Sequence, residues 1–232
     1  RVIENLLGLR RANRLKFSKE EYTKFLSDKE KDNVEKYEND KTLFDVVETW
    51  LERTPFLKDD KFDFWKAYKK SVNKMLDNDI KIIKENTYLT NEGKEEQINN
   101  YKNIYENYDL LFDVDKYQKF IDSGVIKISQ KASLAALFIM LYRDEPILHA
   151  PYRLVTKLID IDNSLNSWRY SHALLAKRMI GNKIGSGGSS GYKYLKKTME
   201  KHNIFNDLSN LSTYLIPKSA LPILPENLKS KL

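Results

Sequence analysis

The stretch SLAALFIMLY occupies residues 133–142 and is apolar on nearly all sides. A helix that is hydrophobic all round is buried in a larger protein, because none of its faces suits water. We therefore predict a central, buried helix here, around which the rest of the chain packs. Pro146 and Pro151 follow this stretch, and since proline disrupts the interior of a helix, both predict a break in the chain.

Apolar residues recur at helical spacing on both sides of this stretch. Before it, the pattern predicts a helix over 42–53 and two long helices over about 65–83 and 98–111. After it, the pattern predicts separate helices over 152–159 and 165–180. No pair of strands is evident, so the predicted fold class is all-α.

The two long helices are rich in charge and are expected to form an antiparallel hairpin with a turn at 91–93. We expect residues from about 30 to 120 to form a peripheral helical excursion, while the two ends of the chain supply the core. The chain has 232 residues, of which 41% are hydrophobic, so it is long enough to bury a sizeable core.

The charge balance does not favour a nucleic-acid partner. Lysine and arginine number 40 against 33 aspartate and glutamate residues, which gives a net charge of +7. The two signs are closely mixed, as in Lys29-Glu30-Lys31-Asp32, and no basic block stands alone. A phosphate-binding face needs clustered positive charge, so the pattern favours solvated helix faces.

The sequence also bears on the compartment of the protein. It contains no run of eighteen apolar residues, so we predict no membrane-spanning segment. No charged and then apolar leader opens the chain, so we predict no secretory signal. Cysteine is absent, which excludes disulfide bonds and thiolate metal sites and agrees with a reducing compartment such as the cytoplasm.

His172 is the histidine that lies within an apolar pattern. Trp168, Leu175 and Met179 fall on the same helical face, so His172 projects from an apolar stripe. On the pattern alone, a core histidine with satisfied hydrogen bonds is the more common outcome, and a metal ligand is the alternative. No second ligand residue lies at chelate spacing on this face. Haem meets that restriction, because its porphyrin supplies four nitrogens and asks the protein for one axial imidazole.

A glycine- and serine-rich run, GSGGSSG, occupies residues 185–191. Its composition is typical of a flexible linker. The alternative is a ligand-binding loop, because glycines let backbone N–H groups approach a ligand and serines add hydroxyls. Composition leaves both interpretations open.

Several motifs together resemble tryptophan 2,3-dioxygenases. The signature stretch of that family is similar to WRYSH at 168–172, RMIG at 178–181 and GSGGSSGY at 185–192. Its animal-type branch is similar to WLERTP at 50–55, YRDEP at 142–146 and NLSTYLIP at 210–217. The matches occur in order along the whole chain, and their spacing agrees.

The resemblance implies that residues 1–232 are the carboxy-terminal part of a single all-helical haem-dioxygenase domain, a helical bundle with a peripheral hairpin. Members of the family are cytosolic homotetramers, built as dimers of dimers, that contain haem b. They insert both atoms of O₂ into the indole ring of L-tryptophan and form N-formylkynurenine, the first step of the kynurenine pathway.

The resemblance also assigns roles to particular residues. His172 carries over as the proximal ligand of the haem iron, and Trp168 and Met179 are expected to lie near the haem. A core aromatic is the alternative role for Trp168. Ser186, where the family usually has threonine, and Gly187 are expected to bind the amino-acid end of the substrate. Serine keeps the hydroxyl but is less restricted at χ1, so we expect looser positioning of the substrate.

The comparison with the family's motifs also bears on two further sets of residues. Trp50, Arg53 and Pro55 are candidates for an accessory tryptophan site, with stabilisation of a turn as the alternative. His149 and His202 match none of the motifs and are not expected to bind metal.

The resemblance begins near Arg1, well inside the family's sequence. Residues that line the distal face of the haem and bind the substrate carboxylate are therefore expected in a segment upstream of Arg1. A separate chain is one possible source of that segment. The alternative function is a non-catalytic helical scaffold or binding module, with which the mixed charges and the glycine-rich run also agree. A scaffold would show no visible absorbance, which distinguishes the two.

Overall fold

The computed structural model divides into two compact units, and each is assembled from two separate parts of the chain. Unit 1 comprises Arg1–Trp50 and Leu154–Asn210, and unit 2 comprises Leu51–Arg153 and Leu211–Leu232. Within them the structure describes residues 6–8, 24, 26–37, 40–53, 58–59, 62–181 and 203–225.

Unit 2 is centred on α9 (Gln130–Leu141), the helix predicted from the apolar stretch. Almost every residue between Ala132 and Leu141 is buried. Ser129 begins the helix, because its hydroxyl accepts the backbone N–H of Ala132 at 3.2 Å. The prediction of a buried helix is confirmed.

The two prolines after α9 act differently. Pro146 begins the short 3-10 helix η1 (Pro146–Leu148), which separates α9 from α10 (His149–Ile180). Pro151 instead lies in the first turn of α10. Its missing N–H is not needed there, because the first N–H groups of a helix have no acceptor within the helix. The predicted break at Pro146 is confirmed, and the one at Pro151 is wrong.

Helix α10 runs without interruption where the sequence pattern predicts two helices, over 152–159 and 165–180. That prediction is wrong, because the polar run between them contains neither proline nor glycine. Aspartate weakens a helix when it bonds to the nearby backbone. In α10 the carboxylate of Asp162 is instead taken up by the N–H groups of Ile204 and Phe205, so the helix continues.

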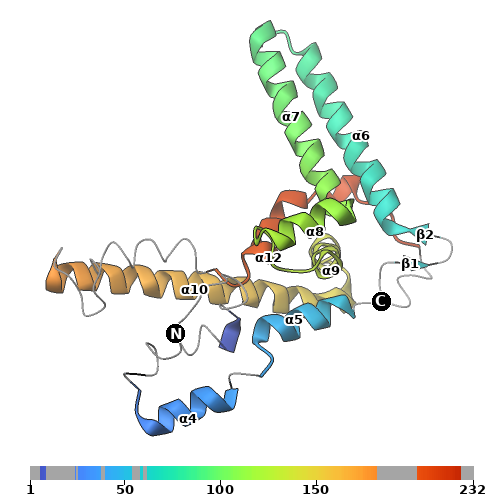
Figure 1. The fold of residues 1–232 in the computed structure, drawn as a ribbon. Helices are drawn as coiled ribbons and strands as arrows, with labels where there is room; N and C mark the ends of the chain where they lie inside the picture. The colour runs from blue at the N-terminus through green and yellow to red at the C-terminus, as the bar shows by residue number, and fades with distance from the viewer. Residues whose placement is uncertain are drawn as a thin grey trace. The chain divides into compact units, whose positions relative to one another are not determined.

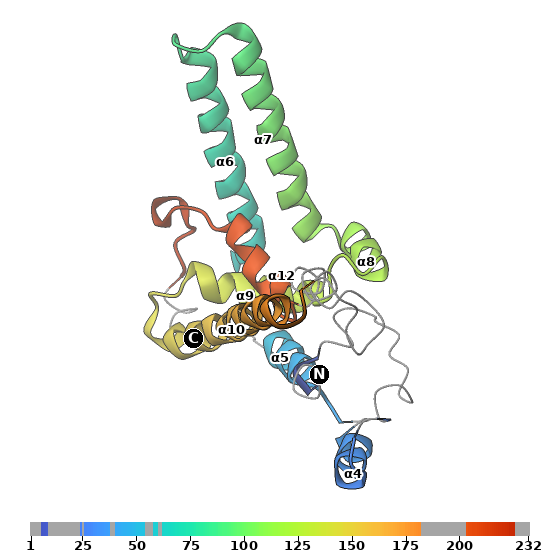
Figure 2. The ribbon, with the colours of Figure 1, turned by 90° about the vertical axis from the view of Figure 1, so that its left-hand side faces the viewer.

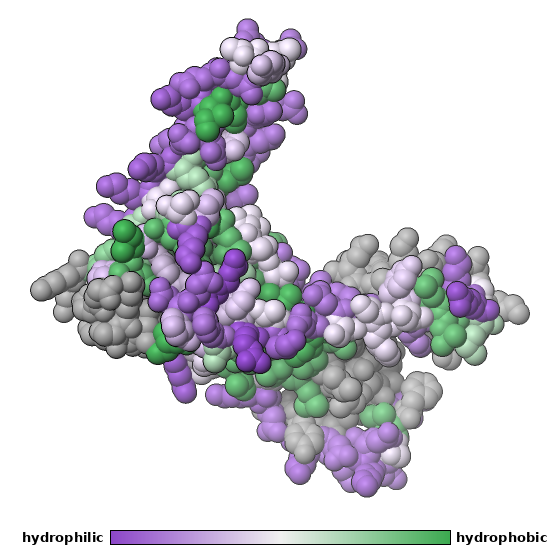
Figure 3. Space-filling view, turned by 180° about the vertical axis from the view of Figure 1, so that it is seen from behind, coloured by the Kyte–Doolittle hydropathy of each residue, from purple (hydrophilic) through white to green (hydrophobic). Residues whose placement is uncertain are grey.

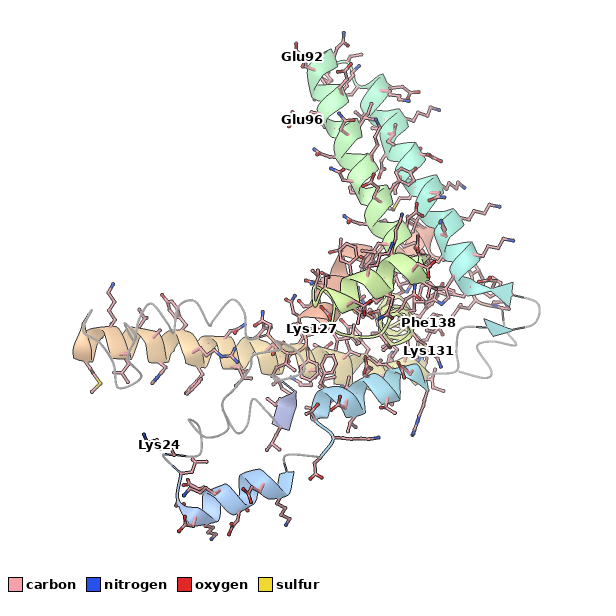
Figure 4. The ribbon with its side chains drawn as sticks, viewed as in Figure 1. Lys24, Glu92, Glu96, Lys127, Lys131 and Phe138 are labelled. Atoms are coloured by element: carbon pink, nitrogen blue, oxygen red, sulfur yellow. The ribbon has the colours of Figure 1, made fainter. Side chains whose placement is uncertain are left out.

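Helices α6 (Phe64–Glu85) and α7 (Asn91–Phe112) lie side by side as the predicted antiparallel hairpin (Figures 1 and 2). Its turn spans residues 86–90 rather than 91–93, because the Thr90 hydroxyl accepts the N–H of Gly93 at 3.2 Å and begins α7. Hydrophilic residues dominate the visible surface of the hairpin (Figure 3), and Glu92 and Glu96 lie near its tip (Figure 4).

A short strand pair precedes the hairpin. Strands β1 (Lys58–Asp59) and β2 (Phe62–Asp63) pair antiparallel. Asp63 then caps α6 by accepting the N–H of Lys66 at 3.0 Å. The sequence pattern does not predict these strands, but two residues each do not change the fold class, and the all-α prediction is confirmed.

Aromatic rings fill the core of unit 2. Phe64 of α6 meets Phe138 of α9 edge-on, with 4.9 Å between the ring centroids (Figure 4 labels Phe138). Tyr142 lies 5.5 Å from the same Phe64 ring. Edge-to-face contacts are favoured because the positive edge of one ring meets the negative face of the other. Further members of this cluster are Trp65, Tyr68, Tyr108, Phe112 and Tyr214.

Unit 2 is completed by α8 (Val114–Asp122) and by the 3-10 helices η2 (Leu211–Tyr214) and η3 (Lys218–Ala220). The hydroxyl of Tyr117 in α8 shares a 2.6 Å hydrogen bond with Ser133 of α9. A buried polar group needs such a partner, so this bond satisfies the polar residue at the start of the apolar stretch.

Unit 1 contains α4 (Asp28–Tyr37), α12 (Asn206–Asn210) and most of α5 (Leu43–Glu52) and α10. Thr42 and Asp45 cap α5 reciprocally. The Asp45 carboxylate accepts the N–H of Thr42 at 2.9 Å, and the Thr42 hydroxyl accepts the N–H of Asp45 at 3.2 Å. Among the described residues of unit 1, the buried apolar side chains are Phe44, Val47, Val155, Leu158, Ala173, Ile204, Phe205 and Leu208.

In the described part of the chain, no helix has both the length and the apolar character that crossing a bilayer requires.

Candidate functional site

Helix α10 positions the candidate ligand His172, and one of its faces is buried in unit 1. Asp162, Arg169 and Ala173 lie on this face, with Val155 and Leu158 further back along the helix. Their spacing follows the helical repeat, so they form a continuous buried stripe. Two of the five are charged, which is unusual, because charged side chains are seldom buried without partners.

The neighbouring face of α10 is apolar but exposed. His172 is exposed, and Trp168, Leu175 and Met179 are 59%, 54% and 75% exposed. These four residues follow three- and four-residue spacing and form one continuous strip, which we call the His172 stripe. Single exposed apolar residues are ordinary, whereas a contiguous group of them marks a binding surface.

The expectation that His172 is buried is therefore wrong, and so is the core role considered for Trp168. Periodicity identifies the residues that share a face, but burial depends on what packs against that face. In α10 the packed face contains Asp162 and Arg169, which are polar, and the more apolar face is left open.

The imidazole of His172 has an aromatic neighbour one turn away. The Trp168 ring stacks on it with 5.5 Å between the ring centroids and 5° between the planes. Residues four apart on a helix meet in this way. The parallel indole lies against one face of the imidazole, so the pair places a nitrogen that could bind a metal ion on an apolar surface.

The buried face holds α10 to a distant segment of the chain through Asp162. One oxygen of its carboxylate accepts the N–H of Ile204 at 2.9 Å, and the other accepts the N–H of Phe205 at 2.6 Å. Bonds from backbone N–H groups to an ionised acceptor are roughly twice as strong as neutral ones. Residues 203–205 therefore have a firm attachment to α10.

Two more side chains of α10 extend this attachment toward His172. Asn166 donates from Nδ2 to the Oδ1 of Asn203 at 2.7 Å. Arg169 donates from Nη1 to the Oδ1 of Asn166 at 2.7 Å. We call the bonds of Asp162, Asn166 and Arg169 the Asp162 clamp.

Sequence reasoning suggested Asp160 or Asp162 as a partner of Arg169, but it did not predict the bonds that join residues 203–205 to Asp162 and Asn166. Asp162 and Asn166 fall at or beside the polar run that separates the two predicted helices. The available signal was their four-residue spacing, in register with Val155 and Leu158, which predicts polar side chains on a buried helical face.

The chemistry of the His172 stripe fits a haem. Haem needs one axial nitrogen from the protein and apolar surface for its macrocycle, and this stripe offers an imidazole flanked by indole, leucine and methionine side chains. In the ranges that the structure describes, no three His, Cys, Asp or Glu side chains gather into a group that could hold a metal ion.

The other predicted site residues are distributed as follows. Trp50 is half-buried in α5, and Arg53 is exposed just after that helix. His149 is exposed at the start of α10. The remaining candidates lie outside the described residues, and they are Pro55, Ser186, Gly187 and His202.

Comparisons with known proteins agree on one family. The family model described as tryptophan 2,3-dioxygenase matches residues 1–215. A tryptophan 2,3-dioxygenase of Bdellovibrio bacteriovorus is 44% identical over all of this chain and 65% of its own length. Those of Dictyostelium discoideum and Xenopus tropicalis are 40% and 37% identical, over 100% and 96% of this chain. The chain spans 58% and 54% of the length of these two relatives.

Proposed function

The chain belongs to the tryptophan 2,3-dioxygenase family, and we propose that it forms the proximal, iron-binding part of a haem-dependent dioxygenase. The reaction we propose is the opening of the indole ring of L-tryptophan by O₂, which yields N-formylkynurenine. The observation that carries the proposal is His172, an imidazole on an exposed apolar stripe within the segment that the family model matches.

His172 is the residue we propose as the axial ligand of haem b. A neutral imidazole is a common ligand for iron, and His172 is exposed enough to reach a bound group. When bound, haem would supply the redox-active iron that O₂ chemistry requires. Trp168 stacks on one face of the imidazole, while the exposed side chains of Leu175 and Met179 would offer the macrocycle an apolar surface.

Ser186 and Gly187 are the residues we propose for binding the amino-acid end of tryptophan. Support comes from the motif that contains them, since a serine hydroxyl and glycine N–H groups can bind carboxylate and ammonium groups. For an accessory tryptophan site we propose Trp50, Arg53 and Pro55, because an indole face and a guanidinium suit an aromatic amino acid.

We further propose that the protein is a cytoplasmic homotetramer, arranged as a dimer of dimers, of the animal-type branch of the family. The branch is supported by the run NLSTYLIP at 210–217. The oligomer is proposed from the family alone, and sedimentation of the purified protein would test it.

Absorbance spectroscopy tests the role of His172 directly. We expect the full-length enzyme to show a Soret band and to convert tryptophan to N-formylkynurenine. His172→Ala should lose both, because no other side chain of the stripe can ligate iron through a nitrogen. His149→Ala is the matched control, since it removes an exposed imidazole from the other end of the same helix. A His172→Ala variant with unchanged haem content would refute the assignment.

A further inference from the structure

We propose that Asp162 is a positioning residue for the His172 stripe, because it sets the orientation of α10 about its own axis. This inference rests on the function proposed above, in which His172 binds the haem iron. Asp162 lies ten residues before His172 on the same helix and on the buried face rather than the exposed one.

Asp162 makes a strong contact with the backbone of residues 204 and 205. Both of its oxygens accept backbone N–H groups, from Ile204 at 2.9 Å and Phe205 at 2.6 Å. The carboxylate and both of these residues are buried, so each N–H would lack a partner if α10 turned away. Leaving a buried donor without an acceptor is costly, so the contact resists rotation of the helix.

The far side of the contact is packed in the core of unit 1. The Phe205 ring stacks on Phe44 with 6.2 Å between the centroids, and Ile204 is fully enclosed in the core of unit 1. Phe44 belongs to α5, whose start is held by the reciprocal caps of Thr42 and Asp45. The Asp162 clamp therefore joins α10 to the buried core of unit 1.

The Asp162 clamp continues along α10 to the turn that bears His172. Asn166 bonds Asn203, and Arg169 bonds Asn166, at 2.7 Å each. Arg169 precedes His172 by three residues and is buried on the clamped face. Because a helix is stiff over one turn, holding Arg169 inward keeps the His172 stripe directed outward.

The test compares Asp162→Asn with Asp160→Asn in the full-length, haem-loaded enzyme. Each replaces one carboxylate of α10 by an amide of the same size. Asp160 is half-buried and pairs with Lys157 at 2.9 Å, outside the clamp. The amide nitrogen that Asp162→Asn introduces cannot accept an N–H, so one bond of the clamp is lost in that variant alone.

We expect Asp162→Asn to weaken haem affinity and kcat/KM for tryptophan by about tenfold or more, the scale of losing one hydrogen bond to a charged group. The Soret maximum of the haem-loaded fraction should also shift. Asp160→Asn should stay within about twofold of the parent in both measurements, since an ion pair whose lysine is largely exposed contributes little.

A purely structural role would lower the melting temperature of Asp162→Asn but leave the haem affinity, Soret maximum and kcat/KM of its folded fraction unchanged, and would overturn the inference. If Asp162→Asn does not fold, Asn166→Ala interrupts the same clamp further along, and haem affinity equal to the parent would overturn it equally. A parent enzyme that takes up no haem would instead refute the proposed function, and the positioning role with it.

Discussion

At the scale of the residue, two positions in unit 1 have a backbone conformation that favours glycine. Gly8 has φ +113°, and a Cβ added to it would lie 2.5 Å from the Cβ of Phe44. Gly181, just after α10, has φ +61°, but a Cβ there would meet nothing within 4 Å. Both positions are in the left-handed region that side chains disfavour, and only Gly8 is also closed by a neighbour.

We therefore expect Gly8→Ala to be the more destabilising of the two alanine substitutions. Gly181→Ala should cost about 1 kcal/mol, the strain of a left-handed backbone. Gly8→Ala adds the displacement of Phe44, a buried core ring, so its cost should be clearly larger. Denaturant unfolding of both variants measures the difference in the free energy of unfolding. Equal losses would contradict the prediction, because they would show that Phe44 can move aside at no cost.

At the scale of elements, the hairpin of α6 and α7 is held by tyrosines of one helix and aspartates of the other. Tyr105 donates to Asp77 at 2.7 Å, and Tyr101 donates to Asp79 at 3.4 Å. Lys69 and Asp109 add an exposed ion pair at 2.7 Å. Charged side chains cover most of the hairpin, and only a few residues of each helix are buried, among them Val72 and Leu76 of α6 and Tyr108 of α7. The specific polar contacts and these buried residues together determine how the two helices pair.

The Tyr105 contact predicts a loss of stability at alkaline pH. Partial burial, and then the hydrogen bond to Asp77, raise the pKa of Tyr105 from 10.0 to about 12. A raised pKa means that folding favours the protonated hydroxyl, so its contribution is complete below about pH 10 and is lost as the pH rises through about 12. Tyr105→Phe should remove this part of the alkaline loss.

Unfolding free energies of the parent and of Tyr105→Phe, measured between about pH 9 and 12, test the prediction. Tyr88→Phe is the control, because Tyr88 lies exposed in the turn of the same hairpin. Identical pH profiles for the parent and Tyr105→Phe would contradict the prediction.

At the scale of the whole molecule, both units depend on contacts between segments that are remote in sequence. In unit 2 the final segment returns to the aromatic core, where Tyr68 donates to the carbonyl of Tyr214 and Tyr142 donates to that of Pro222 at 2.6 Å. Lys218 also pairs with Asp144 at 2.8 Å on the surface. In unit 1 the Asp162 clamp likewise joins α10 to residues 203–205, about forty positions further along the chain.

These contacts should differ in their effect on global stability. Tyr142→Phe should lower the free energy of unfolding by about 1 kcal/mol, because it leaves a carbonyl of the final segment without its buried donor. Lys218→Ala should change stability little, since both members of that pair are largely exposed. Thermal unfolding distinguishes them, and a larger loss from Lys218→Ala would contradict the assignment.

Local patterns in the sequence were sufficient for much of this fold. The apolar run at 133–142 predicts α9, and two amphipathic runs predict the hairpin of α6 and α7. These features depend on helical spacing and on hydrophobicity within about twenty residues, which a sequence displays directly. The family was likewise evident from short motifs, including the one that contains His172.

Only the tertiary structure decided which side of α10 is buried. The sequence alone determined that His172, Trp168 and Met179 share an apolar face, but this face is open, and the buried one contains Asp162 and Arg169. Burial of those polar residues depends on residues 203–205, some forty positions away, whose backbone N–H groups satisfy the carboxylate. Helical periodicity is a property of neighbours along the chain, and it shows which residues of α10 share a face. The segment that packs against a face is distant in sequence, so the periodicity does not identify residues 203–205 as the partner.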